Sequence, residues 1–314
     1  MRIFLAGATG AVGKRLLPML IDDGHEVVAL TRDAAKADAL RAAGAMPVVA
    51  DALDREAVLG AVLGAEPDVV VHQLTALQGM GDMKHFDDDF AQTNRLRTEG
   101  LAILLDAAQA AGARRAVVQS YTGWPFAAVG GAVKDEDAPL ATAEVPAAQR
   151  RTLAAIRELE ARTLDTPGVE GVVLRYGALY GPGTSLGADG DITALVRRRR
   201  LPVVGDGGGV WSFTHIDDAA GAVLAALAPG GPAGVFQIVD DEPAPVREWL
   251  PALAAAVGAK PPRRIPAWLG RLAVGDAGVR MMTATRGAAN ARARQELGWT
   301  PRHPRWSAGF RQAM

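Results

Sequence analysis

Three glycines near the N-terminus, Gly7, Gly10 and Gly13, separate a short apolar run from a helical pattern. Residues 2–6 read as a buried strand, and the apolar positions within residues 12–21 mark one face of a helix. A glycine turn at such a junction lets the backbone pass close to a pyrophosphate, and the helix N-terminus offers it unpaired N–H groups. The glycine pattern alone is weak, but in this position it predicts a dinucleotide site.

Short Val-rich runs alternate with Ala- and Leu-rich helical stretches along the first half of the chain. Strands are expected at residues 27–30, 46–51, 68–73 and 115–120, and helices at residues 33–43, 54–63, 92–111 and 150–163. This alternation is typical of βαβ units. We therefore predict an α/β fold with a Rossmann-type, doubly wound parallel sheet, which binds ligands at the carboxyl ends of its strands.

Composition and charge exclude several classes of protein. The chain has 314 residues, of which 49% are hydrophobic, and no apolar run approaches the ~18 residues of a membrane span. The first strand starts at residue 2, so we expect no secretory leader and a cytoplasmic protein. The absence of cysteine excludes disulfides and thiol chemistry, and the five histidines show no metal-ligand spacing. A net charge of −1 gives no reason to expect nucleic acid or membrane partners.

Further motifs follow the glycine turn in a characteristic order. They are DALD at 51–54, VVHQLTA at 70–76, LRYGALYGPG at 174–183, WSFTHIDDAAGAV at 211–223 and ELGWTP at 296–301. In this order and spacing the chain resembles the extended short-chain dehydrogenase/reductase superfamily, the NAD(P)-dependent epimerase/dehydratase type. The resemblance covers essentially the whole chain, although each motif alone is weak evidence.

The resemblance implies a Rossmann domain with a smaller C-terminal substrate lobe, and an active cleft between them. The implied NADP-binding domain is 1–182 with return segments 211–227 and 234–240, and the implied lobe is 183–314, mainly 183–210 and 241–314. Helices at 92–111 and 147–163 form a four-helix dimer face in such enzymes, so a homodimer is an expectation.

The resemblance also implies which residues hold the cofactor. Beside Gly7, Gly10 and Gly13 they are Thr9, Ala11, Val12, Thr31, Arg32, Asp51, Ala52, Gln73, Leu74, Thr75, Ser120, Arg175 and Tyr176. Asp51 and the next backbone N–H would hold the adenine, although a carboxylate at a strand end can equally cap its own loop.

Position 32 bears on the choice between NADPH and NADH. NAD enzymes place an acidic residue near the end of the second strand, where it binds the ribose 2′-hydroxyl. This chain has Thr31 and Arg32 there, and an arginine would meet a 2′-phosphate with charge-assisted hydrogen bonds. Asp33 leaves an alternative open, because it could cap the next helix or turn inward and favour NADH. We predict NADPH; Arg32 could also be a solvated surface residue.

The catalytic pair of the family is missing. Its members use Tyr-x3-Lys on a helix, where the lysine lowers the pKa of the tyrosine that gives the proton. Aligning Glu160 with the family's glutamate puts Thr152 at the tyrosine position and Ile156 at the lysine position. Neither residue can replace the pair. The remaining candidates are Ser120, Tyr121 and Thr122 at the end of the fifth strand, with Thr122 at the family's catalytic Ser/Thr.

The missing pair leaves several functions open. In our main prediction the protein is an NADPH-dependent ketoreductase that acts on a bulky, hydroxylated ketone of the aromatic polyketide kind, as in antibiotic biosynthesis. The proton would come from the substrate hydroxyl, water or a local hydroxyl, and the chain resembles atypical ketoreductases of polyketide tailoring in this respect. The alternatives are a non-catalytic NADP-binding regulator and a sugar-nucleotide epimerase or dehydratase, which would also need the missing pair.

Overall fold

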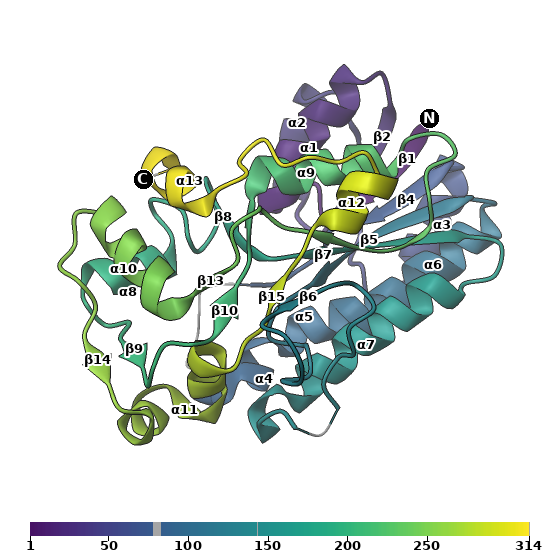
Figure 1. Cartoon of the computed structure of the whole chain (residues 1–314). Helices are drawn as coiled ribbons and strands as arrows, with labels where there is room; N and C mark the ends of the chain where they lie inside the picture. Colours follow the sequence, from purple (N-terminus) through teal and green to yellow (C-terminus); the bar gives the residue numbers. More distant parts are fainter. Residues whose placement is uncertain (78–82, 143, 314) are drawn as a thin grey trace.

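The central sheet is parallel and seven-stranded in the computed structural model, which describes residues 1–77, 83–142 and 144–313 (Figure 1). Its strands are β1 (Arg2–Ala6), β2 (Glu26–Thr31), β3 (Met46–Val49), β4 (Val69–His72), β5 (Arg115–Tyr121), β7 (Glu170–Tyr176) and β12 (Gly234–Ile238). Their order is β12-β7-β5-β4-β1-β2-β3. The chain therefore leaves one edge after β3 and re-enters beside β1 at β4, and this reversal makes the switch point where Rossmann folds bind ligands.

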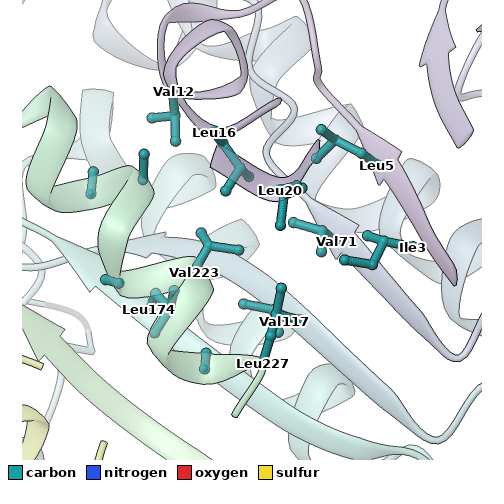
Figure 2. Close-up of a cluster of buried hydrophobic side chains, with 14 of the residues drawn as sticks. Ile3, Leu5, Val12, Leu16, Leu20, Val71, Val117, Leu174, Val223 and Leu227 are labelled. Carbon is teal, nitrogen blue, oxygen red and sulfur yellow. The ribbon is translucent and has the colours of Figure 1, made fainter. Parts of the chain in front are cut away.

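Helices cover both faces of this sheet, which is why its strands are continuous apolar runs. They are α1 (Ala11–Asp22), α2 (Ala37–Ala42), α3 (Arg55–Ala65), α6 (Leu101–Ala110), α7 (Arg150–Asp165) and α9 (Ile216–Ala226). On one face, α1 and α9 pack side by side, and Leu16, Leu20 and Val223 meet Val71 and Leu174 from the sheet (Figure 2). On the other face lie α3, α6 and α7. The predicted α/β fold is confirmed.

The stretch predicted as one helix over 92–111 is broken into consecutive segments. They are α5 (Ala91–Arg95), η3 (Leu96–Gly100) and then α6, and the short elements η2 (Met83–His85) and α4 (Phe86–Asp89) precede them. The segment η3 is π-helical. Because a π-turn inserts an extra residue into the helical repeat, it changes which side chains face the sheet.

A second group of short elements lies at the carboxyl end of the sheet (Figure 1). It comprises β6 (Val133–Lys134), β8 (Ala178–Tyr180), α8 (Asp191–Arg197), β9 (Val203–Val204), β10 (Val210–Trp211), β11 (Phe213–His215), β13 (Ala244–Pro245), α10 (Val246–Ala256), β14 (Arg264–Ile265), α11 (Ala267–Thr283), β15 (Gly287–Ala288), α12 (Ala291–Glu296) and α13 (Trp306–Ala313). Tyr180, Phe213, Trp249 and Phe310 form its aromatic core. The predicted division at residue 182 stays a prediction.

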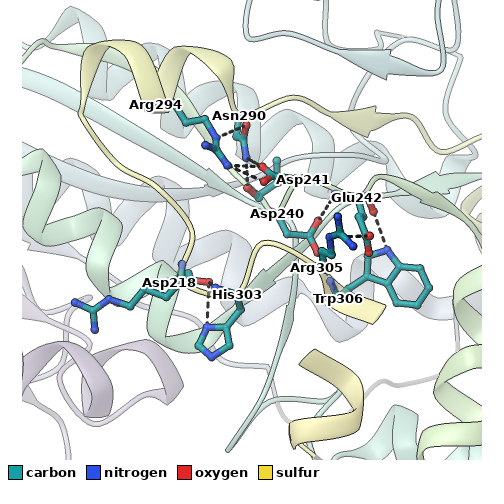
Figure 3. A network of polar contacts seen from close by, with 11 residues as sticks. Asp218, Asp240, Asp241, Glu242, Asn290, Arg294, His303, Arg305 and Trp306 are labelled. Carbon is teal, nitrogen blue, oxygen red and sulfur yellow. Dashed lines mark hydrogen bonds and ion pairs between the residues drawn. The ribbon is translucent and has the colours of Figure 1, made fainter. Parts of the chain in front are cut away.

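Carboxylates that follow β11 and β12 attach the C-terminal segment to the rest of the molecule (Figure 3). Asp240 accepts a hydrogen bond from the backbone N–H of Trp306 at 2.8 Å. Asp218 accepts from the N–H groups of Arg302 and His303. Asp241 pairs with Arg294 at 2.7 Å. These contacts give the terminal residues a fixed path across α9. No helix in the part of the chain that the structure describes is long and apolar enough to cross a membrane.

Candidate functional site

A cavity of about 540 Å³ opens at the carboxyl ends of the central strands. It extends from the glycine turn, past the ends of β2 and β4, to α7 and residues of the second group. Of the predicted cofactor residues, those that line it are Gly7, Thr9, Gly10, Ala11, Val12, Thr31, Arg32, Asp51, Ala52, Gln73, Leu74, Thr75, Ser120 and Tyr176. The structure therefore brings most of the predicted set to one cavity. Gly13, Thr122 and Arg175 are not among the described residues of this lining.

The glycine turn is shaped by close backbone approaches. Gly7 has φ of +108°, and a Cβ there would lie 2.6 Å from the carbonyl oxygen of Gln73. At Gly13, a Cβ would lie 2.1 Å from the carbonyl oxygen of Gly7, so this glycine allows α1 to pack against the turn. Both positions exclude a side chain. Gly13 thus packs against the backbone of the glycine turn and does not face the cavity, which explains its absence from the lining.

The N-terminus of α1 lies at the glycine turn and has no side-chain cap. Its N-cap is Gly10, which has no side chain to accept from the first-turn N–H groups. The helix has 12 residues and no acidic residue in its first turn. Uncapped N–H groups and the positive end of the helix dipole form an anion site. Together with the excluded Cβ atoms, this donor set fits the pyrophosphate of a dinucleotide.

Two cations line the end of the cavity beside β2. Arg32 and Lys36 are both exposed there. The sequence left open whether Asp33 caps the next helix or turns toward the cofactor. Its carboxylate accepts a hydrogen bond from Ala35 N at 3.0 Å and lies 3.7 Å from Lys36 Nζ. Its carboxylate therefore caps its own 3₁₀ turn. Thr31 accepts from the N–H of Asp33 at 3.2 Å, and its predicted cofactor contact stays a prediction.

Some polar groups of the side chains after β3 and β4 already form hydrogen bonds within the protein. Asp51 accepts from Leu53 N at 2.9 Å, so one carboxylate oxygen shapes its own loop. Gln73 accepts from the hydroxyl of Tyr176 at 3.3 Å, while its Nε2 is buried with no hydrogen-bond partner among the described residues. A buried amide donor without a partner is costly. This orphaned donor is a second feature that fits a bound polar cofactor.

Thr152 and Ile156, at the positions of the missing pair, both line the cavity. The Thr152 hydroxyl donates to Asp87 Oδ1 at 2.6 Å and accepts from Asn94 Nδ2 at 2.9 Å. Asp87 is 3% exposed and also accepts from the backbone N–H groups of Thr152 and Arg151. The single proton of Thr152 is therefore bound to a buried carboxylate, and Ile156 contributes only an apolar wall.

Ser120 belongs to a second buried network. Its hydroxyl donates to Glu160 Oε1 at 2.7 Å. The same carboxylate accepts two hydrogen bonds from Arg175, at 2.8 and 2.6 Å. This bidentate pair joins α7 to β7. Glu160 and Arg175 thus form one buried ion pair, and the predicted cofactor contact of Arg175 stays a prediction.

The other two candidate hydroxyls differ from each other. Thr122 donates to Gln237 Oε1 at 2.6 Å and is 3% exposed. Tyr121 lines the cavity, and its hydroxyl has no hydrogen bond to the described residues. Burial raises the pKa of Tyr121 to about 12, although the nearby Arg97 guanidinium opposes the rise. A phenol with this pKa is a weaker acid than an unperturbed tyrosine, and the catalytic roles of Ser120, Tyr121 and Thr122 stay predictions.

Sequence reasoning missed Arg97, which lies in η3 and lines the cavity. Its side chain is buried, and its positive charge lowers the pKa of Tyr121, against the larger effect of burial. Its position three residues after Asn94 was the available signal, because residues at that spacing share a helix face. The π-turn, which places it toward the cavity, has no clear mark in the sequence.

The structure also brings His215, Asp218 and His303 within 4.8 Å of one another. The two imidazoles stack with 3.6 Å between ring centroids. Both oxygens of Asp218 already accept backbone N–H groups from residues 302 and 303. The spacing of the histidines in the sequence did not indicate this group, because it forms only where the C-terminal segment crosses α9.

Comparison with known proteins shows the family. A model of the NAD dependent epimerase/dehydratase family matches residues 3–238, and the chain belongs to this family. A Streptomyces protein named 3-diazoavenalumate denitrifying reductase is 49% identical over 313 residues, covering 99% of each chain. The 2-alkyl-3-oxoalkanoate reductase of Stenotrophomonas maltophilia is 31% identical over 270 residues, 82% of this chain and 76% of that protein.

The fold is also that of known structures. A human epimerase family protein, crystallised with NADPH, superimposes with a TM-score of 0.75 at 20% identity, covering 100% of this chain and 99% of that chain. At this identity the likeness shows the fold alone. Together with the family match and the reductase relatives, it confirms the predicted short-chain dehydrogenase/reductase type and an NAD(P)-dependent oxidoreductase.

Proposed function

We propose that this protein is an NADPH-dependent reductase that acts on a diazo-substituted aromatic carboxylate and releases dinitrogen. The name of the 49% identical relative denotes a reductase that removes nitrogen from a diazo-substituted carboxylate. The observation that carries the proposal here is that the hydroxyls of Thr152 and Ser120 are already hydrogen-bonded within the protein. Thr152 and Ser120 each donate their only proton to a buried carboxylate, Asp87 and Glu160.

A diazo substrate removes the need for the missing acid. Carbonyl reduction produces an alkoxide, which must be protonated, whereas an aryl diazonium group is already cationic. Addition of hydride to the terminal nitrogen forms an N–H bond and a neutral diazene. The diazene loses its N–H proton to solvent, the C–N bond breaks with its electron pair left on the ring carbon as dinitrogen leaves, and that carbon takes a proton back from solvent. In sum, Ar–N₂⁺ and hydride give Ar–H and N₂, so no net proton is required from the protein.

The cofactor, when bound, supplies this hydride from its reduced nicotinamide. The uncapped N-terminus of α1 and the turn at Gly7 would hold the pyrophosphate. Arg32 and Lys36 would bind a 2′-phosphate, because Asp33 turns its carboxylate to Ala35 N. Two cations and a diverted carboxylate at this end favour NADPH over NADH.

A ketone, which was the main prediction from the sequence, is the second candidate substrate. It is favoured by the 31% identical relative, whose name denotes the reduction of an oxoalkanoate. In this case a hydroxyl on the substrate, water or Tyr121 would protonate the alkoxide. Since burial raises the pKa of Tyr121 to about 12, a neighbouring substrate hydroxyl is the better donor.

The two candidates are separated by matched substrates. The purified protein and NADPH would be incubated with a hydroxyaryl carboxylate that carries either a diazo or an acetyl group at the same ring position. Loss of reduced nicotinamide and product mass would be followed together. We expect turnover of the diazo compound to the unsubstituted arene. Turnover of the acetyl compound alone would replace the proposal with the second candidate, and turnover of neither would contradict both.

A further inference from the structure

Arg97 places a buried positive charge in the wall of the cavity. The residue is 7% exposed and lies in η3, among the described residues that line the cavity. Its Nη1 is 3.4 Å from Asn94 Oδ1, and its guanidinium carbon is 5.9 Å from the centre of the Phe90 ring. Neither neighbour is an anion. Five N–H donors of a guanidinium are thus served by one long hydrogen bond to the described residues.

Other buried arginines of the chain have carboxylate partners. Arg175 forms a bidentate pair with Glu160, and Arg115 lies 2.7 Å from Glu170. No carboxylate oxygen of the described residues lies within 4.0 Å of Arg97. A buried charge without a partner is strongly unfavourable. The contrast indicates that the partner of Arg97 is a molecule that enters the cavity.

Neither of two nearby aspartates serves as an anionic partner for Arg97. Asp87 is buried nearby in the fold but is occupied by the hydroxyl of Thr152 and by backbone N–H groups. Asp89 lines the cavity but is exposed to solvent. Burial lowers the pKa of Arg97 to about 10, which still leaves the guanidinium charged at neutral pH.

The wall beside Arg97 is aromatic. Phe86 and Phe90 stack with 4.4 Å between ring centroids, and Trp124 meets Phe86 edge-on at 5.4 Å. All three line the same cavity as Arg97. Aromatic walls suit a flat ring, and a guanidinium binds a carboxylate with two parallel hydrogen bonds.

We propose that Arg97 binds the carboxylate of the substrate while its aromatic part packs against Phe86, Phe90 and Trp124. This inference rests on the proposed function for the use of the cavity as a substrate site. It adds the residue that selects for an anionic substrate. Arg97 is in this account a binding and specificity-determining residue, and it takes no part in hydride transfer.

The test is a binding measurement that needs no turnover. The protein with NADP⁺ bound would be titrated by calorimetry with 4-hydroxycinnamate and with its methyl ester, which has the same ring but no charge. We expect the carboxylate to bind at least about tenfold more tightly, because the ester cannot form the charge-assisted hydrogen bonds that a guanidinium forms with a carboxylate. Arg97→Met should remove this preference, and Arg97→Lys should retain part of it.

Arg95→Met is the matched control. Arg95 lies two residues earlier, is exposed and pairs with Glu99 at 2.8 Å, so its loss should leave the preference unchanged. NADP⁺ affinity reports the fold of every variant, and Arg97→Gln replaces Arg97→Met if the latter does not bind NADP⁺. Equal binding of acid and ester by the wild type, or an unchanged preference without Arg97, would overturn the inference. Failure of the proposed diazo reduction would appear only in turnover, so the two failures are distinguishable.

Discussion

The hydroxyl of Thr152 donates to the carboxylate of Asp87 at 2.6 Å, on the helix where the family carries its proton-donating tyrosine. Because Asp87 is 3% exposed and its nearest ion-pair partner among the described residues is Arg151 at 3.6 Å, it is a strong acceptor for this proton. At the position of the family's tyrosine this chain therefore has a hydroxyl whose proton is held in an internal hydrogen bond, in the wall of a cavity that fits the proposed cofactor.

Thr152 is expected to matter for stability and little for turnover. Thr152→Ala should lower the free energy of unfolding by about 1–3 kcal/mol, because Asn94 and Asp87 lose a buried partner. Turnover should stay within about tenfold, since a general acid contributes about 10²–10⁴. Denaturant unfolding and initial rates measure the two effects. Thr152→Ser keeps the hydroxyl and serves as control; a thousandfold slower but well-folded Thr152→Ala would show that the hydroxyl participates.

Arg32 should control cofactor preference. NADPH should bind at least about tenfold more tightly than NADH, with about 1–3 kcal/mol lost when the charged hydrogen bonds are removed. Arg32→Asp should shrink this difference. Arg41→Asp makes the same charge change on the exposed face of α2, where Arg41 pairs with Asp38, and should not alter it. Calorimetry measures the dissociation constants of NADPH and NADH for the wild type and each variant, and equal constants for the two cofactors in the wild type would disprove the prediction.

Glu160 should be a major source of stability in α7. Glu160→Gln leaves Arg175 buried without a full charge partner and should cost about 3–5 kcal/mol. Glu158→Gln, two residues earlier, breaks an exposed pair with Arg162 and should cost less than about 1 kcal/mol. Urea unfolding of both variants gives the comparison. Similar losses at the two positions would mean that the buried network contributes no more than a surface pair.

His72 should make stability depend on pH. Burial lowers its pKa to about 4, whereas an unfolded histidine titrates near 6.5. The unfolded chain therefore binds the extra proton first, and stability falls as the pH decreases from 6.5 towards 4. Between pH 6.5 and 5 the loss should be about 2 kcal/mol.

The positive charge of Arg97 also lowers the pKa of His72, and so it adds to the loss of stability at low pH. Denaturant unfolding at several pH values should show a shallower slope for His72→Gln than for the wild type. His85→Gln, at an exposed histidine, should follow the wild type. Parallel slopes for His72→Gln and the wild type would refute the linkage.

The sequence predicts the Rossmann part well because its signals are local. The apolar run at residues 2–6 is β1, and the glycine turn lies at the cavity as predicted. The strand expected over 46–51 ends at Val49, where Ala50 and Asp51 already line the cavity. Strand ends are set by where pairing with β2 stops, which the residue pattern does not encode.

The site is less predictable because its polar groups are paired across the chain. Asp87 and Thr152 are 65 residues apart, and Ser120 and Glu160 are 40 apart. Such pairings depend on how α4 and α7 pack against the sheet. The sequence analysis gives Arg97 no role, and only the π-turn and the fold around it reveal a buried charge.

The central claim is that hydride transfer here proceeds without a proton donor from the protein, on a diazo group. The most direct measurement is the ratio of dinitrogen released to NADPH oxidised, under anaerobic conditions with a diazo-substituted hydroxyaryl carboxylate. The account predicts one molecule of dinitrogen for each NADPH, and a slower reaction when the transferred hydrogen of NADPH is replaced by deuterium. Oxidation of NADPH without dinitrogen, or dinitrogen release at the same rate without NADPH, would contradict it.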